Sequence, residues 1–221
     1  MPHLILQLSV TMLLIFSLPT NIATKTTDDS LVLDVDGNPI EVGSAYYVRT
    51  ELSKAGIGGG LVTASKPNHT QCPQYVAQLA YGFEGEIPVT FYPSSSSQKF
   101  IHISSDLNII FNTTSNVCSQ GAWQLTPDAS NGNLYLSTGG VIGNPGSHTI
   151  ANWFKIARSP YDPKFYQLEY CPDAKTVASA TGDIVCGAID ALDSTDDFLL
   201  MWLGLKTIRP DFFHWLSFVK A

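Results

Sequence analysis

Short runs of β-branched and aromatic residues, separated by clusters of Gly, Pro, Asn and Ser, constrain the fold of this chain most strongly. After residue 30 such runs recur at short intervals, whereas no window of about 11 residues carries a helical apolar stripe. Val, Ile, Tyr and Phe favour extended backbone because their side chains pack well on a pleated surface. The sequence therefore predicts an all-β fold, and about a dozen strands with regular turn signals are typical of a sandwich or barrel.

The predicted strands share this composition and are bounded by turn residues. They are residues 45–52, 60–65, 75–79, 87–92, 100–104, 107–112, 123–126, 134–138, 154–157, 165–170, 184–189, 198–203 and 213–220. We expect the last two to close the domain, with residues 207–211 as their connection. A chain of 221 residues suffices for one ordinary domain and is short for two, so all strands are assigned to a single domain.

The first 23 residues differ from the rest of the chain. Residues 4–18 are almost continuously apolar, and Pro19 and small or polar residues follow up to Ala23. About 15 apolar residues are too few to span a bilayer, and the pattern is typical of a secretory signal peptide rather than of a buried N-terminal helix. We expect a signal peptide at 1–23, a tail at 24–30 and a folded domain at 31–221, in a protein that is secreted or vacuolar.

Charge and motif content narrow the function classes. Charged residues make up 14% of the chain and the net charge is −7, so no basic stripe is present for a nucleic acid backbone. The chain has no GxSxG, nucleotide-binding or HExxH motif. We therefore expect that the protein is not an enzyme and binds no cofactor or metal. Asp193, Asp196 and Asp197 lack the spacing of a calcium-binding loop and fit a solvated turn.

Four cysteines are present, at Cys72, Cys118, Cys171 and Cys186. None of their spacings is that of a zinc site, and thiols pair in the oxidising compartment that an exported chain enters. We expect two disulfide bonds. Four cysteines allow three connectivities, and the residues alone do not choose among them.

Two Asn-X-Thr triplets begin at Asn68 and Asn112. In an exported protein, such triplets accept N-linked glycans when they lie in exposed loops. Such triplets also occur by chance, so the alternative is that both are unmodified polar turns.

The segment LVLDVDGNPIEVGSAYYV at residues 31–48 resembles the N-terminal signature of the plant Kunitz family, the family of soybean trypsin inhibitor. Further stretches similar to this family are GGGL at 58–61, CP at 72–73, SDLNI at 105–109, GGVIGNPG at 139–146, WFKI at 153–156 and YQLEYCP at 166–172. The stretch at 139–156 resembles the miraculin-like branch. The resemblance implies a β-trefoil of twelve strands in three pseudo-repeated units, with disulfides Cys72–Cys118 and Cys171–Cys186.

The resemblance also implies an inhibitory loop. In this family a protruding loop between the fourth and fifth strands enters the cleft of a serine protease as a substrate that is hardly turned over. The corresponding segment here is EIPVTFYPSSSSQK at residues 86–99. Ungapped alignment places the specificity residue near Thr90, and a gapped alternative places it at Pro88. The inhibitory contacts are therefore assigned to Ile87, Pro88, Val89, Thr90, Phe91 and Tyr92.

Two features depart from the trypsin-inhibiting pattern. No Lys or Arg occurs between Glu84 and Gln98, and the Asn that braces the loop in inhibitory relatives is Val42 here, which cannot donate the bracing hydrogen bonds. We expect a monomeric inhibitor whose partner is a serine endopeptidase other than trypsin. The alternatives are a non-inhibitory miraculin-like binding or storage protein, and an inhibitor of a cysteine protease or α-amylase.

Overall fold

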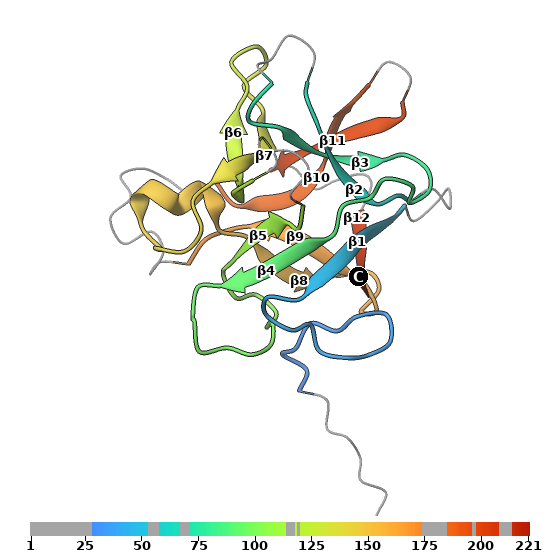
Figure 1. The fold of residues 1–221 in the computed structure, drawn as a ribbon, viewed down its shortest axis with the longest axis vertical. Helices are drawn as coiled ribbons and strands as arrows, with labels where there is room; N and C mark the ends of the chain where they lie inside the picture. The colour runs from blue at the N-terminus through green and yellow to red at the C-terminus, as the bar shows by residue number, and fades with distance from the viewer. Residues whose placement is uncertain are drawn as a thin grey trace, which may run out of the picture.

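The computed structural model describes residues 28–52, 58–66, 71–113, 118, 120–173, 185–195, 198–207 and 214–221. The predicted signal peptide and Asn68 lie outside these residues, so both stay predictions. The described residues form twelve strands and one short 3-10 helix, η2 (Figure 1). The strands are β1 (Ala45–Leu52), β2 (Leu61–Ala64), β3 (Tyr75–Leu79), β4 (Val89–Pro93), β5 (Leu107–Phe111), β6 (Ala122–Pro127), β7 (Leu134–Gly140), β8 (Lys155–Arg158), β9 (Tyr166–Tyr170), β10 (Gly187–Ser194), β11 (Leu200–Lys206) and β12 (His214–Lys220), and η2 spans Ser147–Asn152.

All strand pairings are antiparallel, and ten of the strands close into a ring. The order is β10, β11, β3, β7, β6, β5, β4, β1, β12 and β9, and β9 pairs again with β10. Strands β2 and β8 are not part of this ring and pair with its members β3 and β9. Closure removes the free edges that an open sheet of this length would expose to other chains. The all-β prediction is confirmed, and the architecture is the β-trefoil.

The core fills the inside of the closed barrel. Alternation along each strand turns one side chain inward and the next outward, so Tyr46 is buried whereas Tyr47 is half-exposed. The Tyr46 ring contacts Phe91, whose ring packs edge-on against Phe218 with centroids 5.6 Å apart. Strands β1, β4 and β12 are therefore joined by aromatic contacts as well as by backbone pairing, and such ring pairs add to the stabilisation from burial alone.

Three strand predictions need correction. Residues 100–104 form no regular strand and pair with the N-terminal segment only through isolated bridges, and Ser104 has a left-handed φ of 58° that ends the extended backbone. Strand β10 lies at Gly187–Ser194, several residues later than the predicted run at 184–189. Strand β11 continues to Lys206 because the aliphatic side chains of Leu203 and Leu205 are both buried in the barrel.

Both disulfides that the resemblance implies are present in the structure. Cys72 is bonded to Cys118 and Cys171 to Cys186. They close loops of 46 and 15 residues, and the chain-entropy model gives stabilisations of about 4 and 3 kcal/mol for loops of these lengths. The first bridge joins the segment before β3 to the segment before β6, and the second joins the end of β9 to the start of β10.

A buried ion pair lies in a second hydrophobic cluster beside β3 and β7. Lys66 Nζ lies 3.2 Å from Asp128 Oδ2 and 3.3 Å from the centre of the Tyr135 ring. Asp128 Oδ1 accepts hydrogen bonds from the Ser130 hydroxyl at 2.6 Å and the Ser130 N–H at 2.9 Å. These bonds, with the Lys66 charge, lower the pKa of Asp128 from 3.8 to about 2.

The low pKa of Asp128 predicts a loss of stability in acid. Because this pKa is lower in the folded than in the unfolded chain, ionised Asp128 stabilises the fold above about pH 4, and the contribution disappears as pH falls through about 2. We expect the free energy of unfolding of Asp128→Asn to fall less over this interval than that of the wild type. Urea titrations with both disulfides intact measure the difference, and equal acid dependence in the two proteins contradicts the prediction.

Candidate functional site

The structure places the predicted inhibitory residues mainly in a strand rather than in a loop. Val89, Thr90 and Phe91 lie on β4, are 0%, 6% and 1% exposed, and pair with β5. Ile87 and Pro88 are half-buried, and Ile87 packs against the core. Burial argues against Thr90 as the specificity residue, because a side chain that supports the barrel interior cannot also enter a protease cleft; the placement at the half-buried Pro88 stays a prediction. Tyr92, the last of the six, is 38% exposed.

The exposed part of the predicted segment is residues 94–99, SSSSQK, which we call the serine loop. Its four serines and Lys99 are exposed, and a turn at Ser96 and Ser97 is closed by the Gln98 N–H, which donates to the Ser95 carbonyl at 3.4 Å. The Ser95 and Ser97 hydroxyls lie 3.2 Å apart. The loop follows β4 and projects from the same side of the barrel as η2 (Figure 1).

Backbone hydrogen bonds fasten the serine loop at both ends. At its start the Ser94 N–H donates to the Asp106 carbonyl at 2.9 Å, and at its end the Lys99 carbonyl accepts from the Val42 N–H at 2.9 Å. The Val42 side chain packs against the core. At this position the chain therefore holds the end of the loop through a backbone hydrogen bond.

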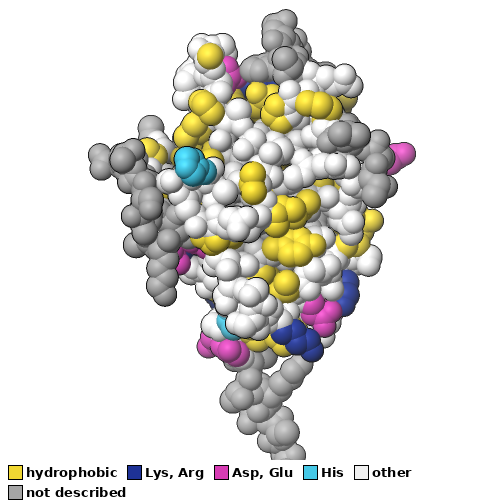
Figure 2. All heavy atoms as spheres, turned by 60° about the vertical axis from the view of Figure 1, so that its left-hand side comes forward, with side chains coloured by type: hydrophobic (Ala, Val, Ile, Leu, Met, Phe, Trp, Pro, Cys, Tyr) yellow, Lys and Arg dark blue, Asp and Glu magenta, His cyan; other side chains and the backbone are white. Residues whose placement is uncertain are grey.

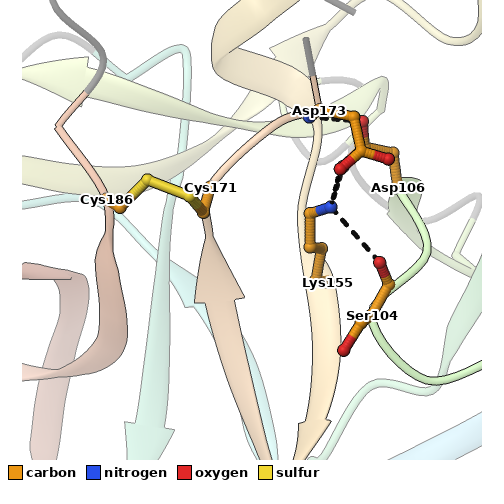
Figure 3. The surroundings of a disulfide bond; sticks show 6 residues. All are labelled: Ser104, Asp106, Lys155, Cys171, Asp173 and Cys186. Carbon is orange, nitrogen blue, oxygen red and sulfur yellow. Dashed lines mark hydrogen bonds and ion pairs between the residues drawn. A yellow bond between two sulfur atoms is a disulfide. The ribbon is translucent and has the colours of Figure 1, made fainter. Parts of the chain in front are cut away.

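An ion network surrounds Lys155 and includes Asp106, the residue whose carbonyl accepts from the start of the serine loop (Figure 3). Lys155 Nζ contacts Asp173, lies 3.3 Å from Asp106 Oδ1 and donates to the Ser104 carbonyl at 3.2 Å. Asp106 Oδ2 accepts from the Asp173 N–H at 2.9 Å. Burial lowers the pKa of Lys155, but the hydrogen bond to Asp173 and the Asp106 charge outweigh burial and leave this pKa above its ordinary value.

This network ties the loop to a disulfide. Asp106 is 2% exposed, and its backbone carbonyl is the acceptor that holds Ser94. Asp173 follows the Cys171–Cys186 bridge by two residues, as Figure 3 shows. The start of the serine loop is therefore fixed to β8 and to the end of β9, both of which belong to a different part of the sequence.

A second exposed loop lies on the same side of the barrel. Residues 141–144, VIGN, connect β7 to η2, and Val141 and Ile142 are 55% and 48% exposed. We call these four residues the VIGN loop. The sequence marked this stretch for its family resemblance and assigned it no contact; its consecutive Gly and Asn residues indicated a loop, but its exposed aliphatic pair was not predicted.

The remaining predicted site residues are placed as follows. Asn112 is exposed and directly follows β5, whereas Thr114 of its triplet lies outside the described residues. Asp193 is exposed on β10, and among the described residues no cluster of His, Cys, Asp or Glu could hold a metal ion. No helix in the described part of the chain is long and apolar enough to cross a membrane.

The described residues thus form a closed β-trefoil that presents a surface loop fastened at both ends. The family model for Kunitz trypsin and protease inhibitors matches residues 32–203. The chain belongs to this family of plant inhibitors, whose members inhibit proteases rather than catalyse a reaction.

Relatives of known description agree with this assignment. The chain is 37% identical over 145 residues to miraculin from Synsepalum dulcificum, and 35% identical over 142 residues to Kunitz trypsin inhibitor 5 from Arabidopsis thaliana. These matches cover 64% of this chain in each case, and 65% and 66% of the relatives, so the chain spans somewhat less than two thirds of their length. Among solved structures, a Kunitz-type cysteine protease inhibitor from potato superimposes with a TM-score of 0.68 at 26% identity, covering 86% of this chain and 97% of that one.

Proposed function

We propose that this protein is a secreted or vacuolar inhibitor of an endopeptidase with a small specificity pocket, and that it acts through the serine loop. The observation that carries the proposal is that four exposed serines lie on a loop fastened at both ends by backbone hydrogen bonds. A loop ordered before association loses little conformational entropy on binding. The family membership supports inhibition in general, and the loop supports this route to it.

The chemistry of the loop favours enzymes other than trypsin. Trypsin binds a Lys or Arg side chain in an acidic pocket, and the serine loop carries a single basic residue, Lys99. Lys99 lies at the base of the loop, where its carbonyl is bonded to Val42. The turn residues Ser96 and Ser97 carry small side chains that fit the shallow pockets of elastase-like or subtilisin-like enzymes.

Inhibition of a cysteine protease is a second candidate. The potato structure, which superimposes with a TM-score of 0.68, is named as a cysteine protease inhibitor. A protein of the same fold thus inhibits an enzyme of this class, which supports the second candidate.

Titration against a panel of proteases tests the proposal. The chain from about Thr24 onwards, with both disulfides formed, is titrated at equilibrium against trypsin, chymotrypsin, subtilisin, elastase and papain. We expect stoichiometric loss of elastase or subtilisin activity while trypsin stays active. Loss of papain activity alone supports the second candidate. Full activity of all five enzymes overturns inhibition and leaves a non-inhibitory binding or storage protein.

A further inference from the structure

We infer that the VIGN loop, together with Tyr92, is a second contact surface for the endopeptidase that binds the serine loop. The inference rests on the proposed function and specifies which part of the inhibitor, beyond the serine loop, determines affinity. It concerns an apolar surface that meets the rim of the protease cleft, on the side of the barrel shown in Figure 2.

Three buried polar side chains hold the VIGN loop in one conformation. Asn108 Oδ1 accepts from the Gly143 N–H at 2.7 Å, Asn152 Nδ2 donates to the Val141 carbonyl at 3.0 Å, and the Thr149 hydroxyl donates to the Asn144 carbonyl at 2.7 Å. Asn108, Thr149 and Asn152 are 0%, 7% and 3% exposed. Such buried side-chain bonds to a surface loop fix its backbone, because losing any of them leaves a buried polar group without its partner.

The braced loop directs two aliphatic side chains to solvent. Gly143 and Asn144 adopt left-handed φ values of 71° and 52°, which turn the chain sharply after Ile142. Val141 and Ile142 stay about half exposed although the barrel core lies close by. The backbone of a rigid loop loses little conformational freedom on binding, so burial of aliphatic side chains that it carries contributes more to affinity than on a mobile loop.

The VIGN loop and the serine loop are joined through the start of β5. Asp106 holds the serine loop through Ser94, and two residues later Asn108 holds the VIGN loop through Gly143. Tyr92 is paired with Asn108 across β4 and β5, and side chains directly opposite in an antiparallel pair project to the same face. Tyr92 therefore lies on the face that carries the VIGN loop, one strand step from the serine loop.

The size of a protease contact requires a surface beyond the serine loop. Stable complexes of this kind bury about 800 Å² on each partner and involve about 20 to 30 residues a side. The six residues of the serine loop cover a minor part of that area. Hydrophobic side chains gather near the middle of the face in Figure 2, and aromatic residues such as Tyr are enriched in the buried centre of interfaces.

The chemistry of this surface defines its occupant. Residues 139–147 carry no charged side chain, so the part of the protease that meets them is apolar and uncharged. Proteases with a charged cleft rim are then disfavoured, and the surface contributes to the choice of enzyme as well as to affinity.

Paired substitutions test the inference. The double variant Val141→Ser/Ile142→Ser removes the aliphatic pair and leaves the backbone braces in place. Its control is Phe198→Ser/Leu199→Ser, which removes another exposed pair, 68% and 55% exposed, at the β10–β11 connection. In Figure 1 this connection lies at the upper right and η2 at the left. Inhibition constants are measured for each protease of the panel that the wild type inhibits.

We expect inhibition by Val141→Ser/Ile142→Ser to be at least about tenfold weaker, mainly through faster dissociation, and the control to stay within about twofold of the wild type. Equal inhibition constants for the two double variants overturn the inference while the proposed function stands. A wild type that inhibits no protease removes the proposed function itself. Sedimentation of the free protein tests whether this surface instead binds a second copy of the chain. If the wild type is a dimer and Val141→Ser/Ile142→Ser is a monomer, the surface belongs to a dimer interface and the inference is overturned.

Discussion

Replacing Ser97 by Arg is expected to create an inhibitor of trypsin that is at least about 100-fold tighter than the wild type. A hundredfold change corresponds to about 2.7 kcal/mol, within the range measured for close charge pairs across an interface. Ser97 is exposed at the turn of the serine loop, so a guanidinium there can reach an acidic specificity pocket without disturbing the barrel. Equilibrium inhibition constants against trypsin measure the gain.

The same substitution at Thr90 is the control. Thr90 is 6% exposed and lies between β1 and β5, so Thr90→Arg buries a charge without a partner and destabilises the fold. We expect Thr90→Arg to gain no trypsin inhibition, and Ser96→Arg shows whether the neighbouring turn residue serves better than Ser97. If Thr90→Arg alone inhibits trypsin, the assignment of the site to the serine loop is wrong.

Removing the ammonium of Lys155 is expected to cost about 3–5 kcal/mol of unfolding free energy, because Asp106 then keeps a buried charge without compensation. Lys155→Met leaves a side chain of similar length, so packing changes little and the electrostatic loss dominates. The carbonyl of Asp106 holds Ser94, and we therefore expect weaker protease inhibition along with the loss of stability. Urea unfolding at neutral pH measures the first effect and the protease panel measures the second.

Two further variants separate the network from a general effect of losing a lysine. Lys164→Met removes an exposed lysine and is expected to change the unfolding free energy by less than about 0.5 kcal/mol. In Lys155→Met/Asp106→Asn the charge of the buried Asp106 carboxylate is removed as well, so we expect the double variant to regain part of the unfolding free energy that the single variant loses. If the single and double variants unfold at the same urea concentration, Asp106 carries no uncompensated charge and the explanation fails.

The candidate site contains residues whose structure the sequence predicted and residues whose role it did not. The run VTF at 89–91 fits a strand by composition, since β-branched and aromatic residues pack on a pleated surface, and the structure places it in β4. The alignment nevertheless assigned these residues to the inhibitory contacts. The four serines that follow have no strand preference and no apolar side chain to bury, and they form the exposed turn. Local composition located the loop better than the ungapped register.

The VIGN loop could not have been predicted from the sequence as a braced surface. Its Gly and Asn residues indicate a turn, but its rigidity comes from Asn108 on β5 and Asn152 at the end of η2. These two side chains are 35 and 11 residues from the backbone groups they bind. The sequence pattern of the loop itself does not reveal these hydrogen-bond partners, because they come together only when the barrel closes.

By itself, the sequence determined the all-β class through the recurrence of short apolar runs and turn residues, and its motifs carried the family resemblance that implied the trefoil and the disulfide pairing. These properties depend on local composition, since strand preference and turn geometry are set by neighbouring residues. Only the tertiary structure decided which exposed residues share a face. Val89, Thr90 and Phe91 are buried in the barrel, and the start of β5 holds both the serine loop, through Asp106, and the VIGN loop, through Asn108. Exposure and proximity depend on contacts between distant segments, and those form only when the whole barrel packs.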